Sequence, residues 1–172
     1  MKGFSFRFSL VPLVAVLVVS LSFDTTAQTI SKAKRDSLMA MSLHDFDQTQ
    51  KGWRQFKDNV PLMIDLLTNY MAINKTEEEI LTWHLGQLYA TNNEYEKAIQ
   101  EMIKTLRPID GTQDELNRSW NFYVMGTIAF LKNDGNTLSR YADSLANNPV
   151  SMNIEVLRRL EKNIGKSYKN SY

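Results

Sequence analysis

The chain of 172 residues contains no cysteine. This absence excludes thiol catalysis, disulfide frameworks, cysteine zinc sites and lipid attachment through a cysteine. Histidine is almost as scarce, because His44 and His84 are the only two, and histidine is the usual proton-transfer side chain near neutral pH. The sequence also lacks a glycine-rich phosphate loop and a serine in a nucleophile-elbow pattern. We therefore predict no catalytic residue, no cofactor and no metal site, and a protein that is not an enzyme.

The chain also lacks an excess of charge of either sign. It has 20 Lys and Arg residues against 19 Asp and Glu residues, a formal net charge of +1. Such a balance gives no electrostatic basis for binding nucleic acid. The 43% share of hydrophobic residues is ordinary for a globular protein, and the length suits a single domain.

Residues 1–27 have the layout of a secretory signal peptide. Lys2 and Arg7 precede an uncharged apolar run at 9–23, which is shorter than the roughly 20 residues that span a bilayer as a helix. Small residues precede a plausible cut between Ala27 and Gln28, a junction that resembles bacterial signal-peptide ends. We predict export across the inner membrane to the periplasm and, after cleavage, no stable membrane insertion. An uncleaved anchor is the alternative.

Proline is rare in the rest of the chain and occurs only at Pro61, Pro108 and Pro149. Because proline costs about 3 kcal/mol inside a helix, these positions predict helix starts or links. No convincing strictly alternating stretch bounded by hairpin turns indicates a β-strand. The fold class predicted is all-α. Helices are expected near residues 31–56, 61–73, 77–91, 94–106, 113–131, 135–147 and 150–168.

Several helix starts are indicated by capping patterns. Thr76 is followed three residues later by Glu79, and such a pair can satisfy two free backbone N–H groups. The segments at 93–96 and 112–115 repeat this pattern. The cluster at 133–136 is suited to ending one helix and capping the next.

Two helix pairs resemble each other, with Gly86 and Gly126 placed 40 residues apart in the first helix of each pair. Leu85, Gly86, Tyr89, Tyr95 and Ala98 stand where the 34-residue tetratricopeptide repeat has Leu, Gly, Tyr, an aromatic residue and Ala. Small side chains at Gly86 and Ala98 allow two antiparallel helices to approach closely. The first pair, at 77–108, resembles this family well.

The second pair, at 117–149, fits less well, because Leu138 stands where the family has a small alanine. The resemblance implies a tetratricopeptide-like array of helical hairpins, an α-solenoid, within one domain at 28–172. Residues 28–75 would form N-terminal helices, 76–149 the repeat pairs and 150–172 a capping helix. An unrelated helical bundle is the alternative.

The resemblance also implies a concave side where a peptide or a partner helix binds. Trp83, Trp120 and Tyr123 would be its anchors, since large aromatic side chains with polar tips dominate binding hot spots. The alternative is that the helices at 31–73 fold over this side and that the aromatic rings are core. The residues expected on the concave side are Ile80, Trp83, Gln87 and Ala90 of the first repeat and Trp120, Tyr123, Thr127 and Phe130 of the second.

The last helix is expected to close the array. Leu157, Leu160, Ile164 and Tyr168 follow Ile154 at helical spacing and would line one side of it, while accompanying basic residues are best explained by solvation.

His44 and Asp47, three residues apart, are too few to specify a metal site. A solvated acidic turn is the favoured interpretation of this segment, and His84 is expected at the surface or in the groove.

Three functional classes remain open. The first is an exported, non-enzymatic module that binds a protein or peptide. The second is a structural or accessory subunit of a cell-envelope complex, with its aromatic face permanently covered. The third is an unfamiliar enzyme that acts through carboxylates. The first is favoured because the scaffold resemblance is present and recognisable catalytic chemistry is absent.

Overall fold

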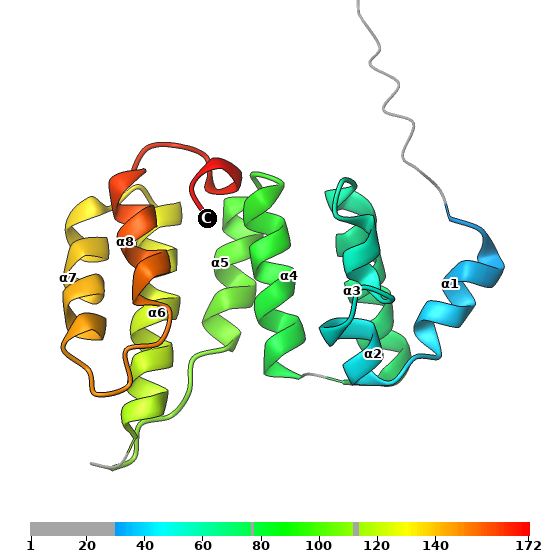
Figure 1. Ribbon diagram of the computed structural model, residues 1–172, viewed down its shortest axis with the longest axis horizontal. Coiled ribbons are helices and arrows are strands. Elements are labelled where there is room, and N and C mark those ends of the chain that lie inside the picture. The colour runs from blue at the N-terminus through cyan, green and yellow to red at the C-terminus, as the bar shows by residue number, and fades with distance from the viewer. Residues whose placement is uncertain (1–29, 77, 112–113) are drawn as a thin grey trace, which may run out of the picture.

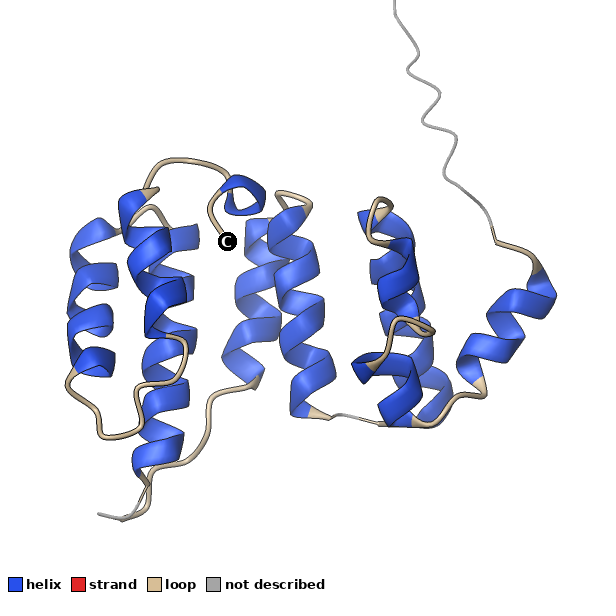
Figure 2. Cartoon of the chain, in the orientation of Figure 1, coloured by secondary structure: helices blue, strands red, loops and turns tan. Residues whose placement is uncertain are grey.

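The computed structural model describes residues 30–76, 78–111 and 114–172, so the expected signal peptide and the expected cap at Thr112 lie outside the described residues. Within these ranges the fold is all-α, as predicted, and no strand is present (Figure 2). The elements are α1 (Lys32–Met39), α2 (Leu43–Gln48), the 3₁₀ helix η1 (Trp53–Phe56), α3 (Val60–Asn74), α4 (Glu79–Thr91), α5 (Tyr95–Lys104), α6 (Glu115–Leu131), α7 (Gly135–Ala146), α8 (Ile154–Lys162) and the 3₁₀ helix η2 (Tyr168–Asn170).

The prediction of one helix at 31–56 is wrong, because this segment forms α1, α2 and η1. The hydroxyl of Ser42 accepts a hydrogen bond of 3.1 Å from the Asp45 backbone N–H and begins a new helix there. After α2 the chain folds back, and Gly52 lies so close to Phe46 that a Cβ at position 52 would overlap the Phe46 carbonyl. A side chain is therefore excluded at the bend.

The helices predicted from residue 61 to residue 147 correspond to α3–α7. Pro61 lies in the first turn of α3, where its missing N–H costs no hydrogen bond. Between α6 and α7, Asn133 adopts a left-handed φ of 57°, and the Asp134 side chain accepts a hydrogen bond of 3.0 Å from the Thr137 N–H. The predicted turn, which ends one helix and caps the next, is confirmed.

The capping boxes predicted at Thr76 and Asn93 are wrong. The N-caps of α4 and α5 are Glu78 and Glu94, and neither makes a side-chain capping bond. The Thr76 N–H donates to the Met71 carbonyl at 3.1 Å, and Asn93 has a left-handed φ of 61°. Both residues therefore close the preceding helix instead of opening the next one.

Successive helices pack side by side along the molecule (Figure 1). Helix α4 packs on α3 and α5, α6 packs on α7, and α8 packs on both α6 and α7. Two hydrophobic clusters result, and α4 contributes to both of them. Leu81, Leu85 and Leu88 of α4 belong to the cluster with α1–α3, whereas Trp83 and Ala90 belong to the cluster with α5–α8.

The two glycines that stand 40 residues apart face different neighbours. A Cβ on Gly86 would lie 2.9 Å from Cγ of Met102 and 3.3 Å from the Ala98 carbonyl oxygen, so the predicted close approach of α4 and α5 is confirmed. A Cβ on Gly126 would lie 2.7 Å from Cδ1 of Leu157 in α8. Gly126 thus accommodates α8.

The prediction of one long helix at 150–168 is wrong in its extent. Helix α8 ends at Lys162, Gly165 has a φ of 84°, and the chain then reverses into η2. Leu157 and Leu160 are fully buried from α8, as expected, and Tyr168 is also buried, although it belongs to η2. The reversal brings η2 against α4, which precedes it by more than 70 residues (Figure 1).

Candidate functional site

Three large aromatic side chains from α4 and α6 meet inside the second hydrophobic cluster. The ring of Trp83 lies 5.1 Å from that of Trp120 and 5.0 Å from that of Tyr123, and Trp120 lies 5.8 Å from Tyr123. The rings are tilted or edge-on to one another, the geometry that contributes about 0.5–1.5 kcal/mol per pair beyond area burial. With Phe130 of α6 they form what we call the aromatic face.

Residues 167–172, here called the C-terminal segment, cover the part of this face formed by Tyr123 and Phe130. The Tyr172 hydroxyl lies 2.9 Å from that of Tyr123, within hydrogen-bond distance, and the Tyr168 ring lies 6.2 Å from that of Phe130. The Tyr168 backbone N–H donates to the Tyr95 hydroxyl at 3.3 Å. The segment is therefore held by α5 and α6 together and contacts α4.

Most of the residues expected on the concave side are buried in the structure. Trp83, Tyr123, Thr127 and Phe130 are each at most 4% exposed, and Ala90 is fully buried. Of the two interpretations that the sequence left open, buried core and open groove, these side chains follow the first. Trp120 and Gln87 are half-buried, and Ile80 alone of the predicted set is exposed.

The helices at 31–73 do not cover these aromatic side chains, which differs from the alternative expected from the sequence. The helices within 31–73 pack on the other side of α4, against Leu81, Leu85 and Leu88. Tyr123, besides its contacts with the two tryptophans, contacts Tyr172 of the C-terminal segment, and Phe130 contacts Tyr168 of the same segment. Tyr123 and Phe130 are thus contacted by a short stretch of chain that lies beside α4, in the middle of the array (Figure 1).

Burial keeps the phenols of this face neutral, while the guanidinium of Arg107 lies 4.9 Å from the centroid of the Trp120 ring. Burial, together with the neighbouring phenols of Tyr172 and Tyr168, raises the pKa of Tyr123 far above its ordinary value. Burial likewise raises the pKa of Tyr168. The Tyr168 hydroxyl is buried near Gln87 but makes no hydrogen bond of good geometry within the described chain. Leaving a buried hydroxyl unpaired is costly, so the fit of Tyr168 is incomplete.

A polar cluster links the N-terminal helices to α4. The carboxylate of Asp47, in α2, is completely buried and accepts hydrogen bonds from Trp53 Nε1 at 3.0 Å and from His84 Nδ1 at 2.8 Å. Arg54 donates through Nε to the Asp47 backbone carbonyl at 2.6 Å, and its guanidinium lies against the His84 ring at 3.4 Å. The Gln48 amide also donates to this carboxylate.

Hydrogen bonds decide the ionisation of Asp47. Burial acts to raise the pKa of Asp47, but the bonds from His84 and Trp53 and the charge of Arg54 together hold it below its usual range. The expectation of a solvated acidic turn is wrong for Asp47, and His84 is its partner instead of a free surface residue. His44, the neighbour considered from the sequence, is exposed. Residues 37 positions apart carry no local signal that would have paired them.

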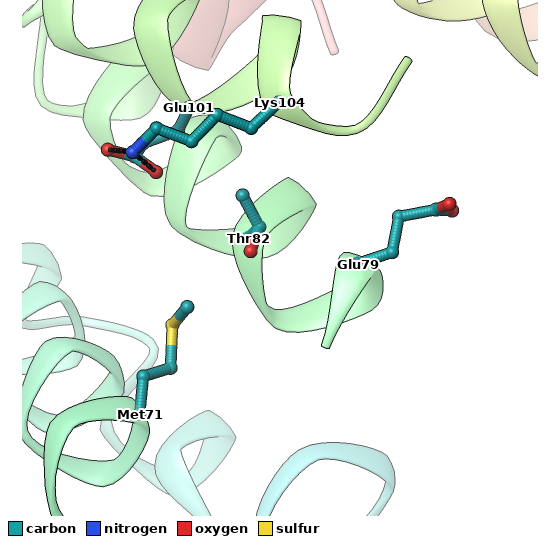
Figure 3. A pocket seen from close by; sticks show the side chains of 5 residues that line it. All are labelled: Met71, Glu79, Thr82, Glu101 and Lys104. Atoms are coloured by element: carbon teal, nitrogen blue, oxygen red, sulfur yellow. Dashed lines mark hydrogen bonds and ion pairs between the residues drawn. The ribbon is translucent and has the colours of Figure 1, made fainter. Parts of the chain in front are cut away.

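A cavity of about 460 Å³ lies between α3, α4 and α5 and is lined by Met71, Glu79, Thr82, Glu101 and Lys104 (Figure 3). Glu101 accepts hydrogen bonds of 2.8 Å from Lys104, and Glu79 points away from this pair in the figure. The Glu79 carboxylate instead receives three hydrogen bonds from Arg107, of 2.6–3.1 Å. Each acid that an enzyme could use here already holds a cation.

Two further features bear on ligands and membranes. Among the residues that the structure describes, no three His, Cys, Asp or Glu side chains are grouped so that they could hold a metal ion. None of the helices in the same ranges combines the length and apolar character needed to cross a membrane.

Comparisons with known proteins return no relative. Neither a protein-family model, nor a curated protein, nor a solved structure matches this chain. The resemblance to the tetratricopeptide repeat therefore depends on the residues quoted for it.

Proposed function

We propose that the protein is a non-enzymatic protein–protein interaction module that binds a peptide or partner helix on the aromatic face of α4 and α6. One observation carries this proposal: in the structure this face already holds a short stretch of chain, the C-terminal segment, through ring contacts and single hydrogen bonds. Buried aromatic anchors in a well-packed pocket are the residues that dominate protein interfaces. A surface built in this way has the chemistry to receive another chain.

The proposal includes a tetratricopeptide-like array. Helices α4 and α5 form one pair, and α6 and α7 a second, with Gly86 and Ala98 at the close approach of the first. Helix α8 packs on α6 and α7 through the fully buried Leu157 and Leu160, as a capping helix would. The packing supports this arrangement without a strict repeat, since Gly126 faces α8.

The proposal also includes export. The charged start and the apolar run at 9–23 support a signal peptide, cleavage after Ala27 and a periplasmic location. Cleavage would remove Lys2, Arg7 and Asp24 and leave equal numbers of positive and negative side chains. That balance supports a protein partner over nucleic acid.

Selection from a displayed peptide library tests the proposed binding. We expect the chain to enrich peptides with aromatic anchors, and bound peptide to slow amide hydrogen exchange in α4 and α6. Trp120→Phe, which reduces a half-buried ring of the face, should weaken binding. Tyr141→Phe on α7 is the control, because Tyr141 lies outside the face and contacts Phe122. An empty selection, or protection confined to other helices, would contradict the proposal.

A second function, an accessory subunit of a larger assembly, is favoured by one edge of the array. The ends of α3 and α5 and the starts of α4, α6 and α8 lie along the same edge, the lower one in Figure 1. Exposed large apolar side chains occur near these ends, which is a feature of interaction surfaces. They are Ile73, Ile80, Ile103, Leu106, Ile109, Leu116 and Met152.

Light scattering during size-exclusion chromatography tests this second function. A stable oligomer that Ile103→Glu converts to monomer would favour the subunit, since Ile103 is half-exposed in this edge. Ser37→Glu, at an exposed position of α1, adds the same charge outside this edge and is the control. A monomer at all concentrations would leave the peptide-binding module as the better description.

A further inference from the structure

We propose that the C-terminal segment is a displaceable self-ligand, and that the natural partner is a peptide segment that presents two aromatic side chains four positions apart, as Tyr168 and Tyr172 do. The inference rests on the proposed function, because it specifies what the aromatic face recognises. It names a recognition pattern that can be read from the contacts of the segment.

The spacing of four follows from the local conformation. The Tyr172 N–H donates to the Tyr168 carbonyl at 3.0 Å, which closes one helical turn and brings the two rings together. Their centroids are 5.0 Å apart with planes 28° from parallel. Tyr168 is 1% exposed, whereas Tyr172 is 46% exposed and reaches Tyr123 with its hydroxyl. One ring is thus the buried anchor and the other a half-exposed clamp.

The contacts also predict which aromatic residue suits each position. The anchor position contains a buried hydroxyl without a well-formed hydrogen bond, so phenylalanine should fit better there than tyrosine. The clamp position uses its hydroxyl against Tyr123 at 2.9 Å, so tyrosine should be preferred there. A partner with Phe at the anchor and Tyr four residues later should bind more tightly than the chain's own sequence.

Several features make the segment displaceable. It reaches the face from α8 through exposed residues, and Gly165, with its φ of 84°, gives this connection a position that tolerates backbone rearrangement. An open hollow of about 330 Å³ bordered by Tyr95, Phe130 and Ser167 lies beside the segment, so solvent reaches its edge. Lys166 and Lys169 are exposed. The segment is held by one fully buried ring, that of Tyr168, and by single hydrogen bonds to Tyr95 and Tyr123.

A competition experiment on the full chain tests the inference. The probe is a fluorescent peptide of residues 163–172, followed by fluorescence polarisation. We expect it to bind the Tyr168→Ala chain at least 10-fold more tightly than the unchanged chain, because the variant loses its own anchor. Lys169→Ala, an exposed position in the same segment, should behave like the unchanged chain. The probe with Phe at position 168 should bind severalfold more tightly, and the probe with Ala there should not bind.

Amide hydrogen exchange of the unchanged chain is a second test of the inference, and it needs no substitution. We expect the amides of Ser171 and Tyr172 to exchange through a local opening that leaves α6 and α8 protected. If Tyr168→Ala is folded by circular dichroism and binds the probe no more tightly, the inference is wrong. It is also wrong if those two amides exchange only with global unfolding.

The two proposals fail in different ways. Selected peptides that protect α4 and α6 but lack paired aromatic residues, with equal affinity for the unchanged chain and Tyr168→Ala, would overturn the inference and leave the interaction module intact. Tight binding of the self-peptide to Tyr168→Ala together with an empty library selection would leave the self-ligand intact and overturn the wider function.

Discussion

Nδ1 of His84 lies 2.8 Å from a carboxylate oxygen of Asp47, and this contact joins α4 to α2 across 37 positions of sequence. The Asp47 side chain has no exposed surface, and two further groups beside it, Trp53 Nε1 and the Arg54 guanidinium, come from η1. The contact fixes the short N-terminal helices on the array. Its energetic consequences can be measured directly.

Replacing Asp47 by asparagine should lower the free energy of unfolding by about 1.5–3 kcal/mol, the range for a lost hydrogen bond to a charged group. The amide keeps the shape of the side chain but cannot accept from His84 and Trp53 with the same strength. Urea unfolding at pH 7 measures the change. Asp58→Asn is the control, since Asp58 is exposed beside η1. Equal stability of the two variants would contradict a stabilising role for the cluster.

The same carboxylate predicts a dependence of stability on pH. The folded pKa of Asp47 lies below its ordinary value of 3.8, so the unfolded chain takes up this proton more readily than the folded one. The contribution of Asp47 is complete above about pH 4 and is lost as the pH falls through the folded pKa. The difference in unfolding free energy between the unchanged chain and Asp47→Asn should therefore shrink with acidification below pH 4. A constant difference from pH 7 to pH 3 would contradict the prediction.

Gly126→Ala should destabilise the fold through α8, because its Cβ would lie 2.7 Å from Leu157. Overpacking of this kind costs about 1–3 kcal/mol, and the gain of about 1 kcal/mol in helix propensity offsets part of that cost. Leu157→Ala alone should cost about 2–5 kcal/mol, and less in the Gly126→Ala background, since the clash is then removed. In the Gly86→Ala background, where the clash is with Met102, the two losses should add. Urea unfolding of the two double-mutant cycles checks this difference.

Acrylamide quenching should separate the tryptophans by their surroundings. Trp53 and Trp83 are buried and should be quenched weakly, whereas the half-buried Trp120 should be quenched more strongly. In Tyr168→Ala the quenching of Trp83 should increase, because the cover of the aromatic face is loosened. Trp120→Phe removes the main competing signal. Unchanged quenching of Trp83 in a folded Tyr168→Ala chain would show that the segment does not shield it.

Local patterns predicted the parts of the fold that depend on neighbouring residues. The helices from α3 to α7 follow from apolar periodicity and proline placement, and Gly86 with Ala98 predicts the close pair α4–α5. The break at Ser42 was missed, although Ser42 followed by Asp45 is a capping pattern that competes with a continuous helix. In that segment the cap decides the structure more than the apolar spacing does.

The candidate site could be predicted only in part, because it depends on contacts between residues that are far apart in sequence. The meeting of Trp83 with Trp120 and Tyr123 followed from the assumed repeat, but the source of the cover over Tyr123 did not. It depends on the reversal at Gly165, which places Tyr168 and Tyr172 over residues far away in sequence. The pair of Asp47 and His84 was missed for the same reason. The spacing of residues within one helix does not predict which side chain from a different segment will contact them.

Helix α4 has one side in each hydrophobic cluster, and no other helix in the described part of the chain supplies fully buried side chains to both. Each cluster is incomplete without the leucines or the Trp83 that α4 provides. Cutting the polypeptide between α3 and α4 would remove the α4 leucines from the cluster of α1–α3. Cutting it after α4 would remove Trp83 and Ala90 from the cluster of α5–α8. Within the described residues, a cut on either side of α4 therefore leaves an incomplete cluster, and melting should be a single all-or-none event.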